Sequence, residues 1–570
     1  MNSLVLLIVC IAALAVGYIC YGGWLCRQWG VGESNEETPA HAMEDGVDYV
    51  PAKAPVLMGH HFSSIAGAGP ITGPIGAAMF GWLPVTLWIL IGGIFFGGVH
   101  DFGALFASIR HKGQSVGEII STNMSRRAKL LFLTFAYLTL ILVVAAFASI
   151  VASTFGVKLD ESGAVDFAAS ASNASVAMVS LLFIVIAIVF GFFVYRRNAP
   201  MSVASVVGVL AIIAIMAVGM NWHPIYLTTS QWMIIVGIYI AIASVTPVWI
   251  LLQPRDYLSS FLLYAMLIVA VVGVVGAHPN IDPELFPAFA GFAVDNGNGI
   301  QYLFPVLFTT VACGAISGFH SLVSSGTTSK QLDKESDAKP IAYGGMLLEC
   351  VLAVLTLCAI GYARKIGTTA GATDIFAGGI AGMVAAIPGL KGAENVLYTL
   401  LVLTYSAFCL TSLDTATRLA RFMFQEFWLE PGQTVKDVQE GWKKVMVNPY
   451  FATVITVILG ILLGMTGYSK IWGLFGAANQ LLAGLGLLAV ATWLGNIGRN
   501  NKMFLAPMAF MMVVTICSLI LTVKNQIGII SAGGADWGPY AQVIFAVLLI
   551  VLAIILVIEG IQTLTRKKTA

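Results

Sequence analysis

Several side chains that can carry or share a proton lie in segments that are otherwise apolar. They are His60, His61, His100, Asp101 and His320. Imidazole titrates near neutral pH and a nearby carboxylate biases that titration, so the set predicts a proton relay. Histidine and aspartate are also metal ligands, which makes a metal site the second interpretation. The third is structural, with hydrogen bonds that tie helices together. The residue types alone leave all three open.

Other polar groups extend this set. Glu349 lies in the middle of an apolar run, where a carboxylate is either protonated or paired. It is therefore a candidate proton carrier and equally a buried hydrogen-bond donor. Hydroxyl groups follow His320 closely, and their oxygens suit Na⁺ or simply cap their own helix end. These hydroxyls belong to Ser324, Ser325 and Thr327.

Three further pairs are predicted to make structural contacts. Asp414 precedes Arg418 by one helical turn, which is the favourable order for an ion pair. Arg255 is expected either to reach water or to pair with Asp256. The third pair, expected to join neighbouring helices, is Asn479 and Gln480.

Glycine and proline interrupt the apolar segment 59–74, and Pro247 interrupts a second one. Freed backbone groups at membrane depth are tolerated only beside protein or a wet cavity, so both breaks predict a binding site. A kinked packing helix is the alternative for 59–74. Amides at a helix N-terminus attract a carboxylate. The predicted substrate-binding residues are Ser64, Gly67, Gly69, Thr72, Ser244, Thr246 and Gln253.

The composition shows what must surround these groups. Of 570 residues, 58% are hydrophobic and 10% are charged, whereas soluble chains carry about 25% charged residues. The apolar surface must therefore face a lipid bilayer. A net charge of +1 gives no broad basic field, which argues against nucleic acid as a partner. The eight cysteines form no CxxC pair, and we interpret them as packed thiols.

Hydrophobic runs long enough to cross a bilayer predict an all-α polytopic membrane protein with roughly fifteen transmembrane helices. The Gly-rich segment 371–390 is a candidate re-entrant segment. The predicted spans are 3–26, 60–80, 83–109, 130–155, 176–195, 200–219, 231–253, 257–277, 299–325, 341–363, 395–421, 450–467, 473–495, 503–523 and 540–562.

The lysines and arginines set the predicted orientation. With the C-terminus in the cytoplasm, alternating spans place all but six of the 29 basic residues inside, as the positive-inside rule requires. This count leaves the orientation of the first helix weakly determined. The six outside are Lys158, Arg364, Lys365, Lys391, Lys470 and Lys524.

The two predicted breaks lie five spans apart, and the two spans that contain them cross the membrane in opposite directions. This is the pattern of an inverted-repeat transporter. We therefore predict a LeuT-like core of five plus five helices with discontinuous helices, surrounded by peripheral ones. The expected divisions are an N-terminal helix and cytoplasmic loop (1–58), the transport core (59–425), and a cytoplasmic linker with peripheral C-terminal helices (426–570).

Five motifs resemble the carbon starvation protein A (CstA) family, whose members are bacterial inner-membrane transporters. The resemblance implies starvation-linked uptake of short peptides or pyruvate and a fold related to the LeuT type, and it does not decide between the two substrates. The chain looks shorter than the best-known members towards the C-terminus. The motifs are Gly59 to Pro74, Val99 to Leu105, Leu252 to Tyr257, Phe319 to Thr327 and Leu474 to Gln480.

The sequence thus predicts a secondary active transporter that imports a small nutrient by cation symport, with H⁺ preferred over Na⁺ as the coupling ion. A channel and a membrane-embedded metal-dependent enzyme are the alternatives. No ring-forming filter repeats in the chain, and the metalloprotease motif HExxH does not occur. No cofactor is assigned, and a metal ion and the oligomeric state are left open.

Overall fold

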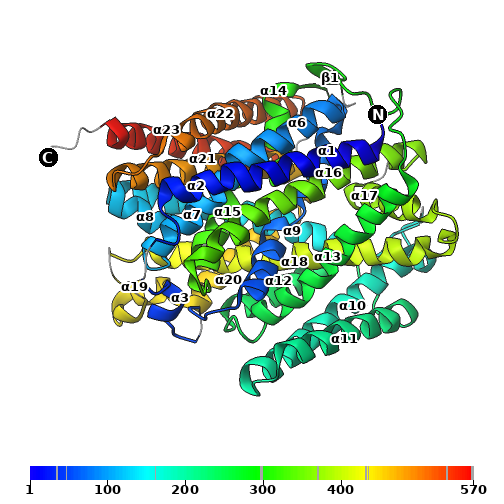
Figure 1. Ribbon diagram of the computed structural model, residues 1–570, viewed down its shortest axis with the longest axis horizontal. Helices are drawn as coiled ribbons and strands as arrows, with labels where there is room; N and C mark the ends of the chain where they lie inside the picture. Colours follow the sequence, from blue (N-terminus) through cyan, green and yellow to red (C-terminus); the bar gives the residue numbers. More distant parts are fainter. Residues whose placement is uncertain are drawn as a thin grey trace.

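The computed structural model describes residues 1–33, 36–46, 48–160, 162–295, 299–368, 371–430, 433, 435–533 and 537–565. Nearly all of the regular structure is helical (Figure 1). The two short strands, β1 (Ala293–Asp295) and β2 (Ile300–Tyr302), form an antiparallel pair in which Ala293 lies opposite Tyr302. This pair lies at the end of the molecule that also holds the N-terminus.

Among the described residues, eleven helical rods are long and apolar enough to cross a membrane. The chain is therefore a multi-pass membrane protein. Their helices are α1 (Ser3–Val16) with α2 (Gly22–Trp29), α6 (Trp82–Gly92) with α7 (Gly98–Arg110), α9 (Arg126–Phe155), α10 (Phe167–Gly191), α11 (Met201–Asn221), α13 (Leu252–Ala277), α16 (Gly344–Lys365), α18 (Glu394–Phe427), α21 (Tyr468–Asn496), α22 (Lys502–Ser531) and α23 (Trp537–Thr565).

Single π-helical turns join or extend some of these rods, and short 3₁₀ turns occur between others. The π turns are Gly17–Tyr21, Gly93–Gly97, Phe192–Arg196 and Lys339–Tyr343; the 3₁₀ turns are Ala78–Phe80, Thr328–Lys330, Glu335–Asp337, Lys391–Ala393 and Val435–Asp437.

The remaining helices are shorter. The other four predicted spans correspond to two broken pairs of helices and two single helices. None of these is among the eleven long apolar rods, so the count of fifteen stays a prediction. The broken pairs are α4 (Ala54–Ala66) with α5 (Gly69–Ala77) and α14 (Leu303–Thr310) with α15 (Gly318–Gly326). The single helices are α12 (Thr229–Val245) and α20 (Pro449–Gly464). The other short helices are α3 (Pro39–Ala42), α8 (Val116–Asn123), α17 (Ala372–Ala385) and α19 (Gly441–Met446).

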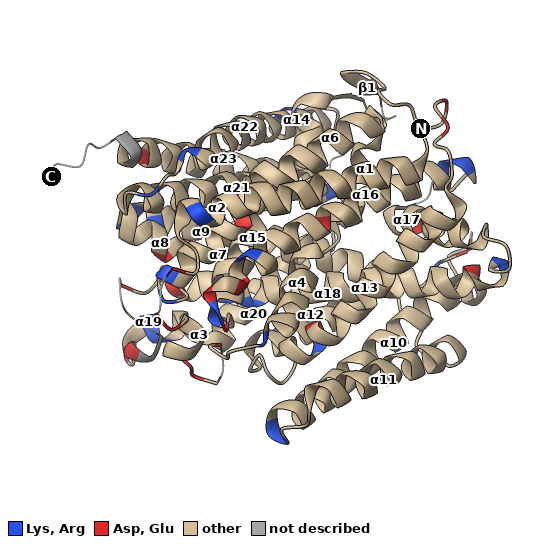
Figure 2. Cartoon of the chain, in the orientation of Figure 1, with Lys and Arg blue, Asp and Glu red and all other residues tan. Residues whose placement is uncertain are grey.

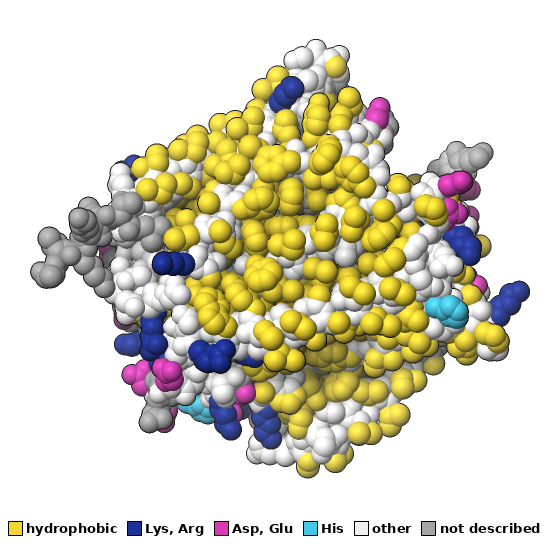
Figure 3. All heavy atoms as spheres, turned by 45° about the horizontal axis from the view of Figure 1, so that its top comes forward, with side chains coloured by type: hydrophobic (Ala, Val, Ile, Leu, Met, Phe, Trp, Pro, Cys, Tyr) yellow, Lys and Arg dark blue, Asp and Glu magenta, His cyan; other side chains and the backbone are white. Residues whose placement is uncertain are grey.

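The surface shows how the molecule meets lipid. Hydrophobic side chains cover the middle of the face in Figure 3, with charged groups along its margins. Figure 2 shows most charged residues at the two ends of the helices, chiefly at the end with α8 and α19. Helix α11 exposes a row of aliphatic residues at the edge of the bundle, whereas α21 is enclosed. A belt of this kind matches the hydrocarbon core of a bilayer.

Two predicted spans are corrected by the structure. Span 299–325 is not one helix, because α14 ends at Thr310 and α15 starts only at Gly318. Span 231–253 is not a helix with an internal break. Helix α12 ends at Val245, and Pro247 lies in the turn before α13. Proline lacks an N–H group and disfavours helical geometry in the residue before it, so the chain turns there.

Candidate functional site

The two broken helices cross at their breaks. Between α4 and α5, Gly67 has φ +25° and ψ −155°, a conformation that suits glycine. The break of the other pair lies directly against α5. A Cβ atom on Gly69 would lie 2.3 Å from Cβ of Cys313, and one on Gly73 would lie 2.7 Å from the carbonyl oxygen of Thr310. The glycines are therefore required for the close approach of the two breaks.

Helix α18 lines this crossing with hydroxyl groups. The Oγ atom of Ser412 donates to the carbonyl oxygen of Ser64 at 2.8 Å, and the hydroxyls of Ser64 and Thr415 lie 3.3 Å apart. On the α5 side, the hydroxyl of Thr72 lies 3.1 Å from that of Tyr405. The predicted substrate residues of segment 59–74 are thus brought together around one break, and all are buried.

The other predicted substrate residues lie elsewhere. The hydroxyl of Ser244 lies 3.1 Å from that of Thr453 on α20, and Thr246 donates to the carbonyl oxygen of Ile242 in its own helix. Gln253 donates to the side chain of Gln331 at 2.7 Å. None of these contacts reaches the α4–α5 break, so the structure divides the predicted set into separate regions.

A buried chain of charged groups links α4, α13, α18 and α12. Nδ1 of His60 lies 2.7 Å from Oδ2 of Asp256, and Oδ1 of Asp256 accepts from Arg255 at 2.8 Å. The other end of the Arg255 guanidinium contacts Asp414 and donates to Tyr239 at 2.6 Å. Tyr239 in turn donates to Asp414 at 2.7 Å. We name these residues the first charge chain.

The first charge chain confirms one predicted pair and replaces another. Arg255 does pair with Asp256, but it is buried and does not reach water. The predicted Asp414–Arg418 pair is wrong, because Asp414 is held by Arg255. Arg418 instead donates to Asp48 at 3.1 Å and to backbone carbonyl oxygens at the C-terminus of α12. The unpaired carbonyl oxygens of a helix C-terminus attract a cation.

A second charge chain links α7, α15 and α16. Oδ1 of Asp101 lies 2.8 Å from Nδ1 of His100. Oδ2 of Asp101 lies 2.8 Å from Nδ1 of His320. Nε2 of His320 faces Oε2 of Glu349 at 3.5 Å. All of these side chains are fully buried. His61 lies apart from the chain, with its Nδ1 atom 2.8 Å from the hydroxyl of Thr328.

The predicted hydroxyl cluster mostly caps its own helix. Ser325 donates to the carbonyl oxygen of Ser321, and Thr327 donates to that of Val323. The buried hydroxyl of Ser324 has no hydrogen-bond partner among the described residues. The two amides predicted to join helices do so: Asn479 accepts from the backbone N–H of Phe319, and Gln480 donates to the carbonyl oxygen of Phe308.

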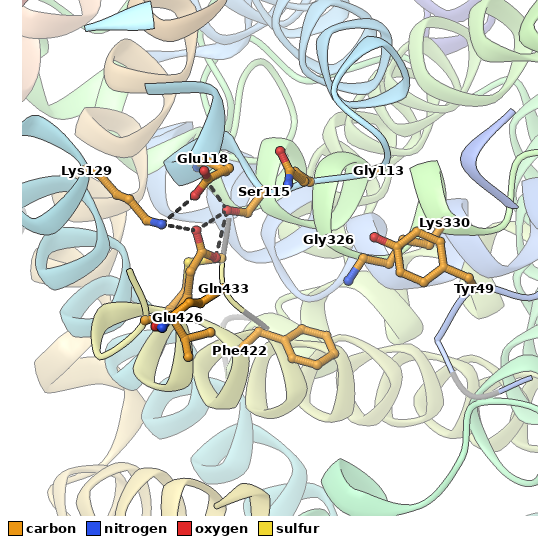
Figure 4. A pocket seen from close by; sticks show the side chains of 13 residues that line it. Tyr49, Gly113, Ser115, Glu118, Lys129, Gly326, Lys330, Phe422, Glu426 and Gln433 are labelled. Carbon is orange, nitrogen blue, oxygen red and sulfur yellow. Dashed lines mark hydrogen bonds and ion pairs between the residues drawn. The ribbon is translucent and has the colours of Figure 1, made fainter. Parts of the chain in front are cut away.

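A pocket of about 200 Å³ opens at the end of the molecule that carries α8 (Figure 4). One wall holds the Lys129 ammonium between Glu118 and Glu426, with Ser115 bonded to Glu426. At the other wall, the Lys330 ammonium lies over the rings of Tyr49 and Phe422. Helices α15 and α18 contribute residues both to this pocket and to the helix crossing.

The pKa values near this pocket reflect burial and charge. Burial lowers the pKa of Lys330, although Asp48 and Glu426 act in the opposite direction. Burial alone would raise the pKa of the Asp48 carboxyl, but the cations Lys330, Arg418 and Arg421 lower it below its ordinary value. Burial and the nearby carboxylates raise the pKa of Tyr49 to about 12.

Comparisons with known proteins agree with this architecture. The family model "Carbon starvation protein CstA" matches residues 2–366 and 358–518. The Bacillus subtilis peptide transporter CstA is 31% identical over 99% of this chain and 97% of its own length. The pyruvate/proton symporter BtsT of Escherichia coli is 33% identical over 63% of this chain and 49% of its own length.

A solved structure shows the same fold. The manganese transporter of Eremococcus coleocola superposes with a TM-score of 0.51 at 13% identity, over 92% of this chain and 99% of its own. At that identity the likeness concerns the fold alone. The family match over most of the length, together with the full-length relatives, shows that this chain belongs to the carbon starvation protein CstA family.

Proposed function

We propose that this secondary active transporter of small nutrients imports short peptides or pyruvate together with protons. The relatives named above are a peptide transporter and a pyruvate/proton symporter, and both kinds of substrate carry a carboxylate. We further propose the inner bacterial membrane as its location, fifteen crossings with the C-terminus in the cytoplasm, and a core of five plus five inverted helices. Arg566, Lys567 and Lys568, on which the orientation partly depends, lie outside the described residues.

The observation that carries proton coupling is the charge balance of the first charge chain. One guanidinium, Arg255, lies between two carboxylates, Asp256 and Asp414, and all three are buried. Arg418, a further buried cation, is paired with Asp48. An uncompensated negative charge in a protein interior is costly. A proton shared by His60 and Asp256 removes that excess charge, so this pair is the proposed coupling site.

The helix crossing is the proposed substrate site. Helices α5 and α15 both begin there, so the positive ends of their helix dipoles lie at the crossing. Such N-termini favour a carboxylate through the helix dipole. Ser64 and Thr72 add hydroxyls on the α4–α5 side. The first charge chain begins at His60 on α4, one turn before Ser64, so protonation and substrate binding affect the same helix.

The test is radiolabelled uptake into proteoliposomes with pyruvate, a dipeptide and a tripeptide offered separately. A pH gradient and a Na⁺ gradient are imposed in turn. We expect the pH gradient, acidic outside, to drive accumulation of one substrate class. A Na⁺ gradient that drives uptake while the pH gradient does not would contradict proton coupling.

Variants locate the coupling site. His60→Gln and Asp256→Asn should abolish accumulation against a gradient while they retain counterflow exchange, because exchange needs no net proton movement. His223→Gln is the matched control, since that imidazole lies away from both charge chains, next to Ser175. Accumulation by Asp256→Asn at the level of the control would remove the first charge chain from the coupling mechanism.

A further inference from the structure

The second charge chain ends in polar atoms that no hydrogen bond explains. Nε2 of His320 and both carboxylate oxygens of Glu349 are buried and lack hydrogen-bond partners among the described residues. Because the Nδ1–H of His320 is directed to Asp101, its Nε2 atom carries a lone pair. This lone pair faces the Glu349 carboxylate at 3.5 Å, beyond the range of a charge-assisted hydrogen bond. Two acceptors that face each other in this way need a proton or a metal cation between them.

A thiol completes the group. Cys313 lies in the break between α14 and α15, and its Sγ atom lies with a ring nitrogen of His320 and a carboxylate oxygen of Glu349 within 4.8 Å of one another. All three residues are buried. Two ligands of a tetrahedral zinc ion lie about 3.3 Å apart, given bond lengths near 2.0–2.1 Å, so the 3.5 Å separation of nitrogen and oxygen fits such an ion.

The surrounding hydrogen bonds match those expected around a bound metal ion. A histidine that binds metal normally donates its other N–H to a carboxylate, and Asp101 accepts that bond from His320. Near the thiol, the Ser317 hydroxyl lies 3.5 Å from the sulfur atom and accepts a hydrogen bond from the amide of Asn479 at 2.9 Å. Such polar groups orient and stabilise a thiolate ligand.

We infer that Cys313, His320 and Glu349 bind one divalent transition-metal ion of the zinc class at the crossing of the broken helices. A set of sulfur, nitrogen and oxygen ligands suits zinc, whereas Ca²⁺ and Mg²⁺ prefer oxygen alone. The thiolate and the carboxylate together balance the charge of a divalent ion. Binding would fasten the non-helical segment 311–317 to α16 and release the thiol and carboxyl protons.

The test measures metal directly and needs no transport assay. The protein is purified without chelator and with its affinity tag removed, and its zinc content is determined by mass spectrometry. We expect about one zinc ion per chain in the wild type. Cys313→Ser and Glu349→Gln should lose it, and Asp101→Asn should weaken zinc affinity about 10–100-fold. Cys358→Ser is the matched control, because that buried thiol on α16 bonds to the backbone of Ser3 instead.

A second readout keeps the result clear if a variant folds poorly. Cobalt added to the metal-free wild type under reducing conditions should give a thiolate-to-cobalt charge-transfer band in the near ultraviolet. Cys358→Ser should retain this band and Cys313→Ser should lack it. Equal zinc content in the wild type and Cys313→Ser, or cobalt binding without the band, would overturn the inference. A protonated Glu349 would then explain better why its carboxyl group faces His320.

Discussion

At the scale of single residues, charge inside this protein is kept in short, nearly neutral chains. Arg418 illustrates the rule, because its guanidinium binds both Asp48 and the carbonyl oxygens of Ala243 and Thr246. Its positive charge therefore compensates both the negative charge of a carboxylate and the partial negative charge of a helix C-terminus. Removal of one member of a buried pair leaves the other without a partner, which costs more than the pair itself contributes.

Arg418→Ala should therefore destabilise the protein by about 3 kcal/mol or more. Arg127→Ala is the control, because Arg127 is 75% exposed and its pair with Glu559 contributes about 0–1 kcal/mol. Unfolding by denaturant in detergent micelles, followed by tryptophan fluorescence, measures both variants. Equal midpoints for the two would show that the α12 terminus does not depend on Arg418.

The lowered pKa of Asp48 gives a pH dependence with a definite sign. A carboxyl whose folded-state pKa is depressed stabilises the fold above its unfolded pKa of about 3.9. That stabilisation is lost as the pH falls through the lower folded-state value. Asp48→Asn should therefore lower Tm at pH 7, and its difference from the wild type should shrink in strong acid. Glu37→Gln at an exposed position is the control, and a difference constant with pH would refute the assignment.

At the scale of elements, the site depends on how closely two broken helices approach. Gly73 allows this, because a side chain there would collide with the backbone of α14 at Thr310. A backbone atom cannot move aside as a flexible side chain can. The α5–α14 contact is thus set by glycine rather than by complementary large side chains.

Gly73→Ala should separate α5 from α14, with a loss of stability of about 1–3 kcal/mol and a loss of substrate binding. Gly473→Ala is the matched control in α21, where a Cβ atom would meet nothing within 4 Å. Helical alanine at such a position is neutral or slightly stabilising. Thermal unfolding and equilibrium binding of labelled substrate measure the two, and normal binding by Gly73→Ala would contradict the proposed crossing.

At the scale of the whole molecule, the ends of the bundle differ. The N-terminus lies at one end and α23 finishes at the other, in agreement with the odd number of crossings that we propose (Figure 1). The end with α8 also carries the basic start of α9, Arg126 and Arg127. By the positive-inside rule, we propose that this end faces the cytoplasm.

A fluorescent protein fused to the C-terminus should therefore fold and fluoresce in cells. A fluorescent protein fused to the N-terminus should stay dark, because it is exported across the membrane in unfolded form. Alkaline phosphatase fused at the same position should be active. Fluorescence at both ends would indicate an even number of crossings and refute the proposed topology.

The class of the protein and the positions of most of its helices could be predicted from the amino-acid sequence. Length and apolar content are local properties, so the predicted spans agree with the helices within a few residues at most positions. The break at 67–68 was also predictable, because glycine and proline act on their own backbone. The break at 311–317 was missed, because only small residues such as Cys313 and Gly314 mark it.

The pairing of the polar groups, in contrast, depends on the folded structure. Asp414 and Arg418 are neighbours along one helix, yet each pairs with a residue more than 150 positions away. Cys313, interpreted from the sequence as a packed thiol, lies beside His320 and Glu349 because three helix segments converge there. Electrostatic energy depends on distance in space, and helix packing sets that distance. Sequence spacing therefore identified the charged groups but not their partners.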